Sequence, residues 1–435
     1  MAIEFGPKDR YRTYGVPSLD LTFADKKSLV DRISGNNLVT FTRSTTATYV
    51  GSDGLIKTAA INEPRFDHNP LTRESLGLLV EEARANLVPY SGNLSSYLTD
   101  GLCSIQSNST TTPDGTNSAV KIVENSGNVH QSRSGASVGG SAYYTLTVFL
   151  KAGERTRAAI SMGAGNALVS INVNLLNGTY TTYANPSWWS NVVYDVTAFP
   201  NSWYKVRVTG YNSYSVTAIG VYPRNTAAAG PSDAAQNIYL GDGVSGFYCW
   251  GAQVEAGTFP TSYIPTTAST VTRAYDVASI TGTNFSSWYN QSEGTLFQNC
   301  ISRVPIGGPG GSNAGAGMIM VNSTTSDTIG FLRQSNSTAL RVYVGTSAFW
   351  NIASQWPQNI ASKAALAYKT DDFAVSANGL TVQTDTLGIV PTVTQLDIGQ
   401  MSTAGYNRIG AGTFSRLTYY PTRLPDATLQ ELTKL

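Results

Sequence analysis

The stretch Tyr143-Tyr-Thr-Leu-Thr-Val-Phe-Leu150 alternates threonine with apolar residues, which is typical of a half-buried β-strand. The same period of two recurs in Val169-Ser-Ile-Asn-Val-Asn-Leu175 and in Trp203-Tyr-Lys-Val-Arg-Val-Thr-Gly210. Short strands of this kind, separated by turn residues, predict an antiparallel β-sandwich or jelly roll over residues 87–268. On the last of these strands, one face carries Trp203, Lys205 and Arg207.

The composition favours strands and tight turns over helices. Charged residues make up 13% of the 435 residues, against about 25% in an ordinary soluble protein, and Gly and Tyr number 41 and 24. The net charge is +1 and no basic run occurs, so we expect no nucleic-acid binding. No stretch of apolar residues is long enough to predict a membrane span. The N-terminal residues lack the apolar core of a signal peptide, so synthesis in the cytoplasm is expected.

A second run of strand patterns follows a Pro/Thr-rich stretch, Phe259-Pro-Thr-Ser-Tyr-Ile-Pro-Thr-Thr267, which we interpret as an extended linker or edge segment. Examples of these patterns are Gly294–Phe297, Met318–Val321, Leu340–Val344 and Lys363–Tyr368. They predict a second β-sandwich over residues 269–435. The chain closes with a short helix predicted from Pro425 onward.

The first 86 residues differ from the rest in charge density, because they carry 22 of the 57 charged side chains. This shift predicts a boundary near Asn86 and a separate N-terminal segment, residues 1–86. Within the segment, strand-like runs around the turn Gly51–Gly54 predict a hairpin, and Ala24–Ile33 suggests a short helix. The stretch Thr72–Arg84 fits a helix, a strand or a loop equally well.

The sequence offers little material for catalysis, so we predict that the chain is not an enzyme. His68 and His130 are the only histidines. The three cysteines, Cys103, Cys249 and Cys300, are odd in number and share no CxxC spacing, so they suggest neither a disulfide framework nor a zinc site. A retaining glycosidase needs two carboxyls about 5–5.5 Å apart, which on one strand means positions i and i+2. No Asp/Glu pair has that spacing, although a pair across two strands stays open.

Sugar binding requires only an aromatic face beside hydrogen-bonding groups, and exposed tryptophans are its simplest candidates. The candidates for a glycan platform are Trp188, Trp189, Trp350 and Trp356. Packing at a subunit interface is the alternative for Trp188 and Trp189, and Trp203, Trp250 and Trp288 are expected in the core. No cofactor is expected, but Asp114 in Pro-Asp-Gly and Asp242 in Gly-Asp-Gly are candidate ligands of a structural Ca²⁺, or simply turn residues.

Several longer motifs resemble modules of tailed-bacteriophage virion proteins. In the N-terminal segment they are Phe41-Thr-Arg-Ser-Thr-Thr-Ala-Thr-Tyr49, Glu63-Pro-Arg-Phe-Asp67 and Gly77-Leu-Leu-Val-Glu-Glu-Ala-Arg-Ala-Asn-Leu87. Trp250-Gly-Ala-Gln-Val-Glu-Ala-Gly resembles the closing strand of a carbohydrate-binding jelly roll. Glu293-Gly-Thr-Leu-Phe and Arg416-Leu-Thr-Tyr-Tyr resemble a concanavalin/laminin-G-like sandwich more loosely.

The resemblance implies a virion structural protein, such as a tail or head fibre, that attaches to other virion proteins through residues 1–86. It also implies a homotrimer and a host-surface glycan as the ligand of the displayed sandwiches. A capsid or collar decoration protein without a receptor, and a polysaccharide depolymerase, remain the alternatives. The expected fold is all-β: an N-terminal anchoring segment followed by two antiparallel sandwiches.

Overall fold

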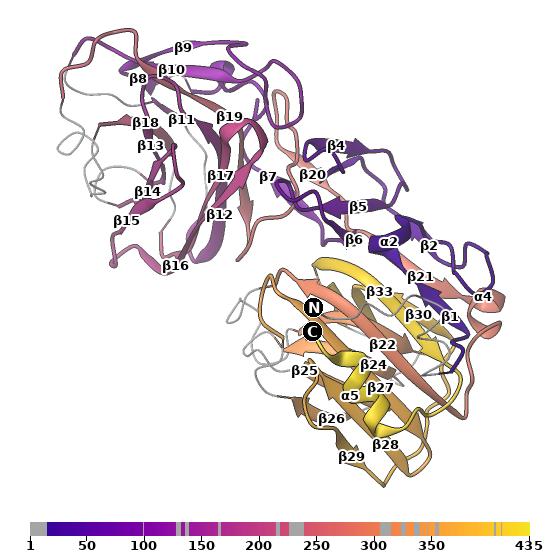
Figure 1. Cartoon of the computed structure of the whole chain (residues 1–435). Coiled ribbons are helices and arrows are strands. Elements are labelled where there is room, and N and C mark those ends of the chain that lie inside the picture. Colours follow the sequence, from indigo (N-terminus) through magenta and orange to yellow (C-terminus); the bar gives the residue numbers. More distant parts are fainter. Residues whose placement is uncertain are drawn as a thin grey trace.

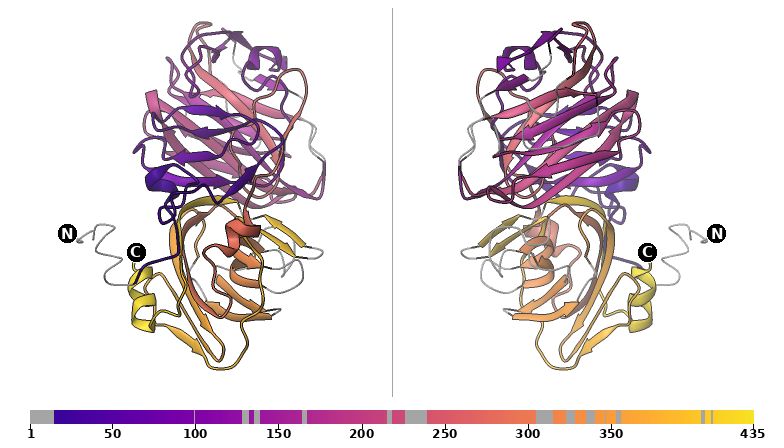
Figure 2. Two further views of the ribbon diagram at one scale, coloured as in Figure 1. Left: turned by 90° about the vertical axis from the view of Figure 1, so that its right-hand side faces the viewer. Right: turned by 90° about the vertical axis from the view of Figure 1, so that its left-hand side faces the viewer.

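A computed structural model describes residues 15–98, 100–127, 132–134, 139–163, 167–214, 218–225, 239–304, 315–322, 328–334, 340–345, 347–352, 356–403, 406–409 and 411–435. The predicted His130 lies outside these residues. The fold is mainly β, and every strand pair among the described residues is antiparallel, as predicted. Two sandwiches form two lobes (Figures 1 and 2), and β4 (Ile56–Ala59) and β5 (Arg65–His68) of the N-terminal residues lie between them (Figure 1).

The first sandwich has two sheets of six described strands each. The sheet here called the β12 sheet runs β16 (Trp189–Phe199), β17 (Trp203–Asn212), β12 (Ala142–Lys151), β19 (Gly246–Ala256), β10 (Val120–Glu124) and β9 (Cys103–Gln106). The β13 sheet runs β15 (Tyr180–Ala184), β14 (Val169–Asn174), β13 (Arg157–Met162), β18 (Ile219–Arg224), β11 (Ser132–Ser134) and β8 (Asp100–Gly101). Apolar side chains such as Val148, Val206 and Ile160 fill the space between them.

The second sandwich pairs an eight-stranded sheet with a seven-stranded one in the described part of the chain. The β22 sheet runs β29 (Gln383–Asp385), β28 (Asp372–Ala377), β27 (Ala361–Lys369), β22 (Glu293–Ser302), β33 (Gly412–Tyr420), β6 (Ser75–Val80) and β5 (Arg65–His68), with β1 (Leu19–Leu21) also on β33. The β30 sheet runs β2 (Thr40–Thr42), β21 (Val277–Thr281), β30 (Gln395–Ile398), β23 (Gly315–Asn322), β24 (Thr328–Gln334), β25 (Leu340–Gly345) and β26 (Ser347–Ile352).

Three two-stranded sheets complete the described strands: β3 (Ala47–Val50) with β4 (Ile56–Ala59), β7 (Arg84–Asn86) with β20 (Val271–Arg273), and β31 (Gln400–Thr403) with β32 (Tyr406–Ile409). The described helices are short: α2 (Phe23–Lys26), α4 (Gly282–Ser286), α5 (Asp426–Thr433), and the 3₁₀ turns η1 (Leu94–Ser96) and η2 (Pro200–Ser202). Helix α5 confirms the predicted C-terminal helix and packs Leu429 beside Ala365 and Ala367 of β27. No helix in the described residues has the length and apolar character to cross a bilayer.

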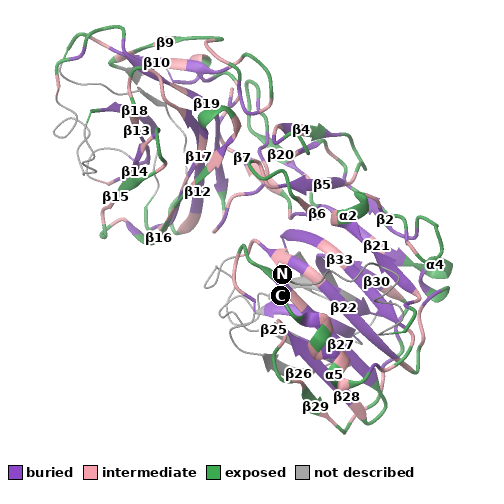
Figure 3. Cartoon of the chain, in the orientation of Figure 1, coloured by how far each residue is buried: buried purple, intermediate pink, exposed green. Residues whose placement is uncertain are grey.

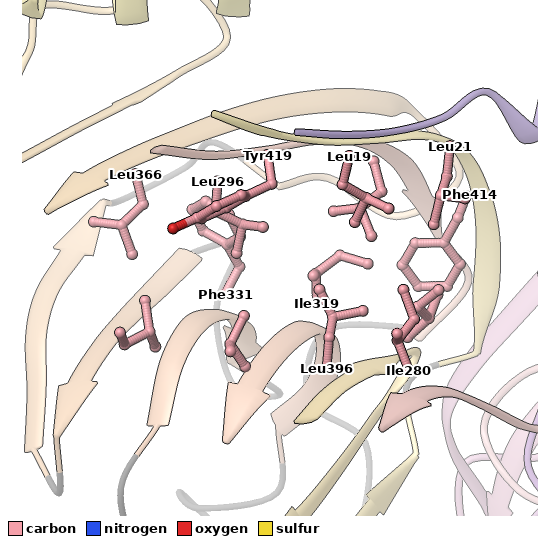
Figure 4. Close-up of a cluster of buried hydrophobic side chains, with 14 of the residues drawn as sticks. Leu19, Leu21, Ile280, Leu296, Ile319, Phe331, Leu366, Leu396, Phe414 and Tyr419 are labelled. Carbon is pink, nitrogen blue, oxygen red and sulfur yellow. The ribbon is translucent and has the colours of Figure 1, made fainter. Parts of the chain in front are cut away.

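The N-terminal residues do not form the separate segment that the sequence predicted. Strands β1 and β6 pair with β33, and β2 pairs with β21, so residues before 86 complete both sheets of the second sandwich. Figure 4 shows Leu19 and Leu21 in one cluster with Phe414 and Tyr419. Figure 3 shows much of β6 buried, whereas β2 buries only Phe41 of its three residues. The residues of one hydrophobic core therefore lie on both sides of the predicted boundary at residue 86.

Local predictions in this region had mixed outcomes. Helix α2 (Phe23–Lys26) overlaps the expected helix Ala24–Ile33 only at residues 24–26. The hairpin exists as β3 and β4, and the ambiguous stretch Thr72–Arg84 contains strand β6. Gly77 has a φ of +96° and lies directly against the backbone of Phe414. Glycine is needed there because a Cβ would overlap the Phe414 carbonyl oxygen.

Candidate functional site

The outer face of the β12 sheet, which points away from the sandwich core, carries polar and charged side chains. Along β17, Val206 and Val208 enter the core, so Lys205 and Arg207 occupy the outer face, as the period of two predicted. The ladder register places Arg207 between Asp195 of β16 and Thr147 of β12. It places Lys205 between Thr197 and Phe149 in the neighbouring row.

A cleft of about 480 Å³ lies over this face, where the first sandwich meets the N-terminal strands and the second sandwich. That volume is within the usual range of about 300–1,000 Å³ for small-molecule sites, which often lie between domains. Its lining comes from four parts of the chain: Thr48–Val50, Ile56, Asp67–Pro70 and Leu76; Phe149, Asp195, Thr197, Phe199, Lys205 and Arg207; Phe259–Tyr263; and Arg303, Gln358 and Asn359.

One wall of the cleft belongs to a small aromatic core. Phe149 packs edge-on against Phe199 at a centroid distance of 5.0 Å, and Trp250 contacts Tyr263 at 4.7 Å. Ile56 of the β4 strand belongs to the same cluster. These buried rings fix the relative position of the β3–β4 hairpin and the β12 sheet, so they give the cleft a preformed apolar wall.

The segment Phe259–Thr267, for which the sequence suggested an extended linker or an edge segment, is packed into this wall. The Thr48 hydroxyl donates to the Tyr263 carbonyl at 2.5 Å, and the backbone N–H of Ile264 donates to Gln253 Oε1 at 2.6 Å. Tyr263 and Ile264 are buried. The segment is extended, as predicted, but its packing ties the two sandwiches together.

The polar lining contains both paired and unpaired charges. Asp67 accepts hydrogen bonds from the Val50 backbone N–H at 2.8 Å and from Arg303 at 2.6 Å. Asp195 accepts the Thr197 hydroxyl at 2.9 Å. By contrast, Lys205 and Arg207 have no hydrogen-bond or ion-pair partner in the described part of the chain.

The surroundings of these two cations disfavour their charged forms. Burial lowers the pKa of the Lys205 ammonium, and nearby Arg303 and Arg207 act in the same direction, while Glu255 and Glu81 oppose them. Burial also lowers the pKa of Arg207, against the attraction of Asp195. The buried Nε of Arg207 and Nε2 of His68 lack acceptors or donors among the described groups. An arriving polar ligand can supply those partners.

Behind the cleft, five fully buried charged side chains form what we call the buried ion cluster: Arg43, Arg65, Glu81, Arg273 and Asp276. Arg65 donates to Glu81 at 2.8 Å and to Asp276 at 2.5 Å. Arg273 donates to Glu81 at 2.6 Å, and Arg43 to Asp276 at 3.1 Å. The cluster joins residues before position 82 to residues after 272, so it holds the rear of the cleft together.

The cluster also fixes the cleft through Ser262. The Ser262 backbone N–H and hydroxyl both donate to Glu81, at 2.8 Å and 2.7 Å. Burial alone would raise the pKa of Glu81, but Arg273, Arg65 and Arg303 outweigh it and hold the pKa well below its usual range. Glu81 therefore stays ionised and continues to accept these hydrogen bonds.

The predicted tryptophan platform is not assembled. Trp189 is 2% exposed and its indole N–H donates to the Ala167 carbonyl at 3.2 Å, and Trp356 is 0% exposed in the second core. Burial therefore removes both from the candidate sugar-binding residues. Trp188 is half-buried and packs against exposed Tyr214 at a centroid distance of 4.3 Å. Trp350 lies on β26 opposite Val342, and its side chain is outside the described part. Trp203, Trp250 and Trp288 are buried, as predicted.

The two candidate Ca²⁺ ligands serve as turn acceptors. Asp114 accepts the Thr116 backbone N–H at 3.0 Å and its hydroxyl at 2.7 Å. Asp242 accepts the Ser245 hydroxyl and the backbone N–H groups of Ser245 and Val244, the latter two at 2.7 Å and 2.9 Å, and these hydrogen bonds lower its pKa. Within the described residues, no three His, Cys, Asp or Glu side chains lie together in a way that could hold a metal ion.

The sequence did not predict that the residues lining the cleft come together in one site. The face shared by Lys205 and Arg207 was recognisable, but the residues that close the cleft come from positions far apart, such as Asp67 and Arg303. Only the packing of the N-terminal strands brings them together.

Comparisons with known proteins give structural likenesses only. No family model matches the chain, and no curated protein does. A carbohydrate-binding module of family 40 from the Ruminococcus gnavus IT-sialidase, bound to α2,3-sialyllactose, aligns with a TM-score of 0.29 and 15% identity over 35% of this chain and 88% of that one. Trypanosoma rangeli sialidase with the inhibitor DANA aligns with a TM-score of 0.28 and 9% identity, over 72% of this chain and 60% of that one. The likeness is one of β-sheet architecture.

Proposed function

We propose that this chain is a glycan-recognising structural protein of a bacteriophage particle, and that the cleft over the β12 sheet is its binding site. The observation that supports glycan recognition is the cleft itself. It combines a rigid aromatic wall, unpaired cationic donors and further amide and hydroxyl groups in about 480 Å³. Such a mixture suits saccharides, which present apolar ring faces beside many hydroxyls.

A glycan array probed with the full chain tests this proposal. The expected result is binding to a restricted set of glycans that weakens when Phe199 at the cleft wall is replaced, as in Phe199→Ala. The matched control is Tyr180→Ala, because Tyr180 is an exposed aromatic on the other sheet of the same sandwich. Absence of binding to every host-surface glycan would favour the decoration protein without a receptor.

The proposal does not include hydrolysis. Of the two carboxylates in the cleft, Asp67 is held by Arg303 and by a backbone N–H, so it lacks the freedom of a catalytic acid. Burial raises the pKa of the Glu82 and Asp397 carboxyls, as general acid catalysis would require, but neither residue lines the cleft. Incubation with a bound polysaccharide should release no reducing ends; their release would support the depolymerase instead.

The place on a virion rests on the resemblance of the N-terminal motifs. Those motifs include buried structural residues such as Arg43, Arg65 and Glu81, so attachment would use the outer surface of a folded region. Immunogold labelling of purified particles should locate the chain on the virion. Light scattering with mass determination tests the expected homotrimer, and a monomer at all concentrations would contradict it.

A further inference from the structure

The charges that line the cleft do not cancel. Asp67 and Arg303 form an ion pair at 2.6 Å and neutralise each other. The remaining charged side chains are Lys205, Arg207 and Asp195. Asp195 stands opposite Arg207 in the β16–β17 ladder, yet no ion pair joins them, and the carboxylate accepts the Thr197 hydroxyl instead. Among the described residues that line the cleft, Lys205 and Arg207 are therefore two cations with Asp195 as the single carboxylate left to balance them.

This arrangement is costly for the protein alone. A polar group that loses water and gains no hydrogen-bond partner costs about 1–3 kcal/mol. The Nε of Arg207 is in that state, with no acceptor among the described residues. Lys205 is half-buried beside Phe149, and its ammonium has no partner within the described part of the chain. Both cations would gain from an anion in the cleft.

The spacing of the two cations suits a single anionic group. Lys205 and Arg207 are two positions apart on one strand, so their side chains leave the same face about 7 Å apart. Both side chains are long enough to reach an anion between them. Arginine also offers paired N–H groups that match the two oxygens of a carboxylate or sulfate.

We propose that the cleft binds an acidic saccharide, and that Lys205 and Arg207 hold its carboxylate or sulfate group. This inference rests on the proposed function and narrows it from glycans in general to anionic ones. A saccharide fits better than a small free anion, because the cleft is much larger than one anionic group. Its aromatic wall, which includes Phe199 and Tyr263, would lie against the sugar ring.

The test compares three probes of similar length by isothermal titration: an oligogalacturonate, a heparin-derived oligosaccharide and a neutral malto-oligosaccharide. Lys205→Gln and Arg207→Gln each remove one cation. Lys151→Gln is the matched control for the first, because Lys151 is on the same outer face but outside the cleft. Arg157→Gln on β13 is the control for the second. Unfolding temperatures of all four variants establish that they are folded.

The expected result is binding of at least one acidic probe, with affinity reduced about tenfold to a hundredfold by each cleft substitution and unchanged by each control. Binding of the oligogalacturonate would show that a carboxylate suffices, whereas binding of the heparin fragment alone would indicate that sulfate is required, because heparin carries both groups. If the neutral malto-oligosaccharide binds and neither cleft substitution changes its affinity, this inference is wrong, but the proposal of glycan recognition still holds. Failure of every probe, together with an array that shows no binding, would overturn both proposals.

Discussion

Replacing Glu81 by glutamine should destabilise the protein severely, because Glu81 is the carboxylate at the centre of the buried ion cluster. Glu81 accepts hydrogen bonds from Arg65 at 2.8 Å and from Arg273 at 2.6 Å, and all three side chains are at most 1% exposed. After Glu81→Gln, Arg65 keeps Asp276, but Arg273 loses its carboxylate partner and remains buried. Removing one partner from a buried ion pair costs about 3–5 kcal/mol.

The assay is urea unfolding followed by circular dichroism and tryptophan fluorescence. With an m-value of about 3 kcal/mol/M, the expected loss moves the midpoint of the affected transition down by about 1–2 M urea. Glu74→Gln is the matched control, because Glu74 is an exposed glutamate on the same segment. If the two variants have the same midpoint, the reasoning about the cluster is wrong.

The same residue predicts a pH dependence. The folded protein holds the pKa of Glu81 below its ordinary value of 4.5, so the unfolded chain binds more protons once the pH falls below that value. The stabilisation by Glu81 is present above pH 4.5 and is lost as the pH falls further. The wild type should therefore lose stability on acidification more steeply than Glu81→Gln. Parallel curves for the two proteins would contradict this account.

Three further outcomes are expected. Trp356→Ala should lower the free energy of unfolding by about 3–5 kcal/mol, because the indole is fully buried, whereas Trp188→Ala should lower it much less; equal losses in urea titrations would contradict this. Gly77→Ala should lower the unfolding temperature of the second sandwich, because a Cβ there overlaps the Phe414 backbone, and an unchanged temperature in calorimetry would refute it. Binding of an acidic saccharide should weaken as the pH rises and the Lys205 ammonium loses its proton. Because burial lowers the pKa of Lys205, this weakening should occur at a lower pH than for an ordinary lysine, and the variant Lys205→Gln should not show it.

The strand pattern of the first sandwich was predictable because its sheets alternate strictly between core and surface. Val206 and Lys205 point in opposite directions from adjacent positions, and the sequence alone places them so. The same period identifies Lys205 and Arg207 as neighbours on one face. It does not reveal that residues such as Asp67 and Arg303 close a cleft over that face, because those contacts depend on strand pairing across more than 200 residues.

The separate N-terminal segment was a wrong prediction with a specific physical cause. High charge density usually indicates a solvated surface. Here Arg43, Arg65 and Glu81 pair with one another or with residues after 272, so charge density indicated buried ion pairs instead. The tryptophans failed for a related reason: Trp189 and Trp356 stand beside polar residues in sequence, but their side chains turn into the two cores.

The pairing of β1 with β33 has a consequence for the order in which the molecule is built. Asp20 and its partner Arg416 are 396 positions apart. At about 5–20 residues per second, the ribosome needs about 20–80 s to make the chain between them. Throughout that interval Leu19, Leu21 and Phe23 lack the strand that buries them. The first sandwich, by contrast, has all its described strands once β19 has been made, well before β33. Between the synthesis of β19 and that of β33, the nascent chain can therefore carry a complete first lobe beside an unfinished second one.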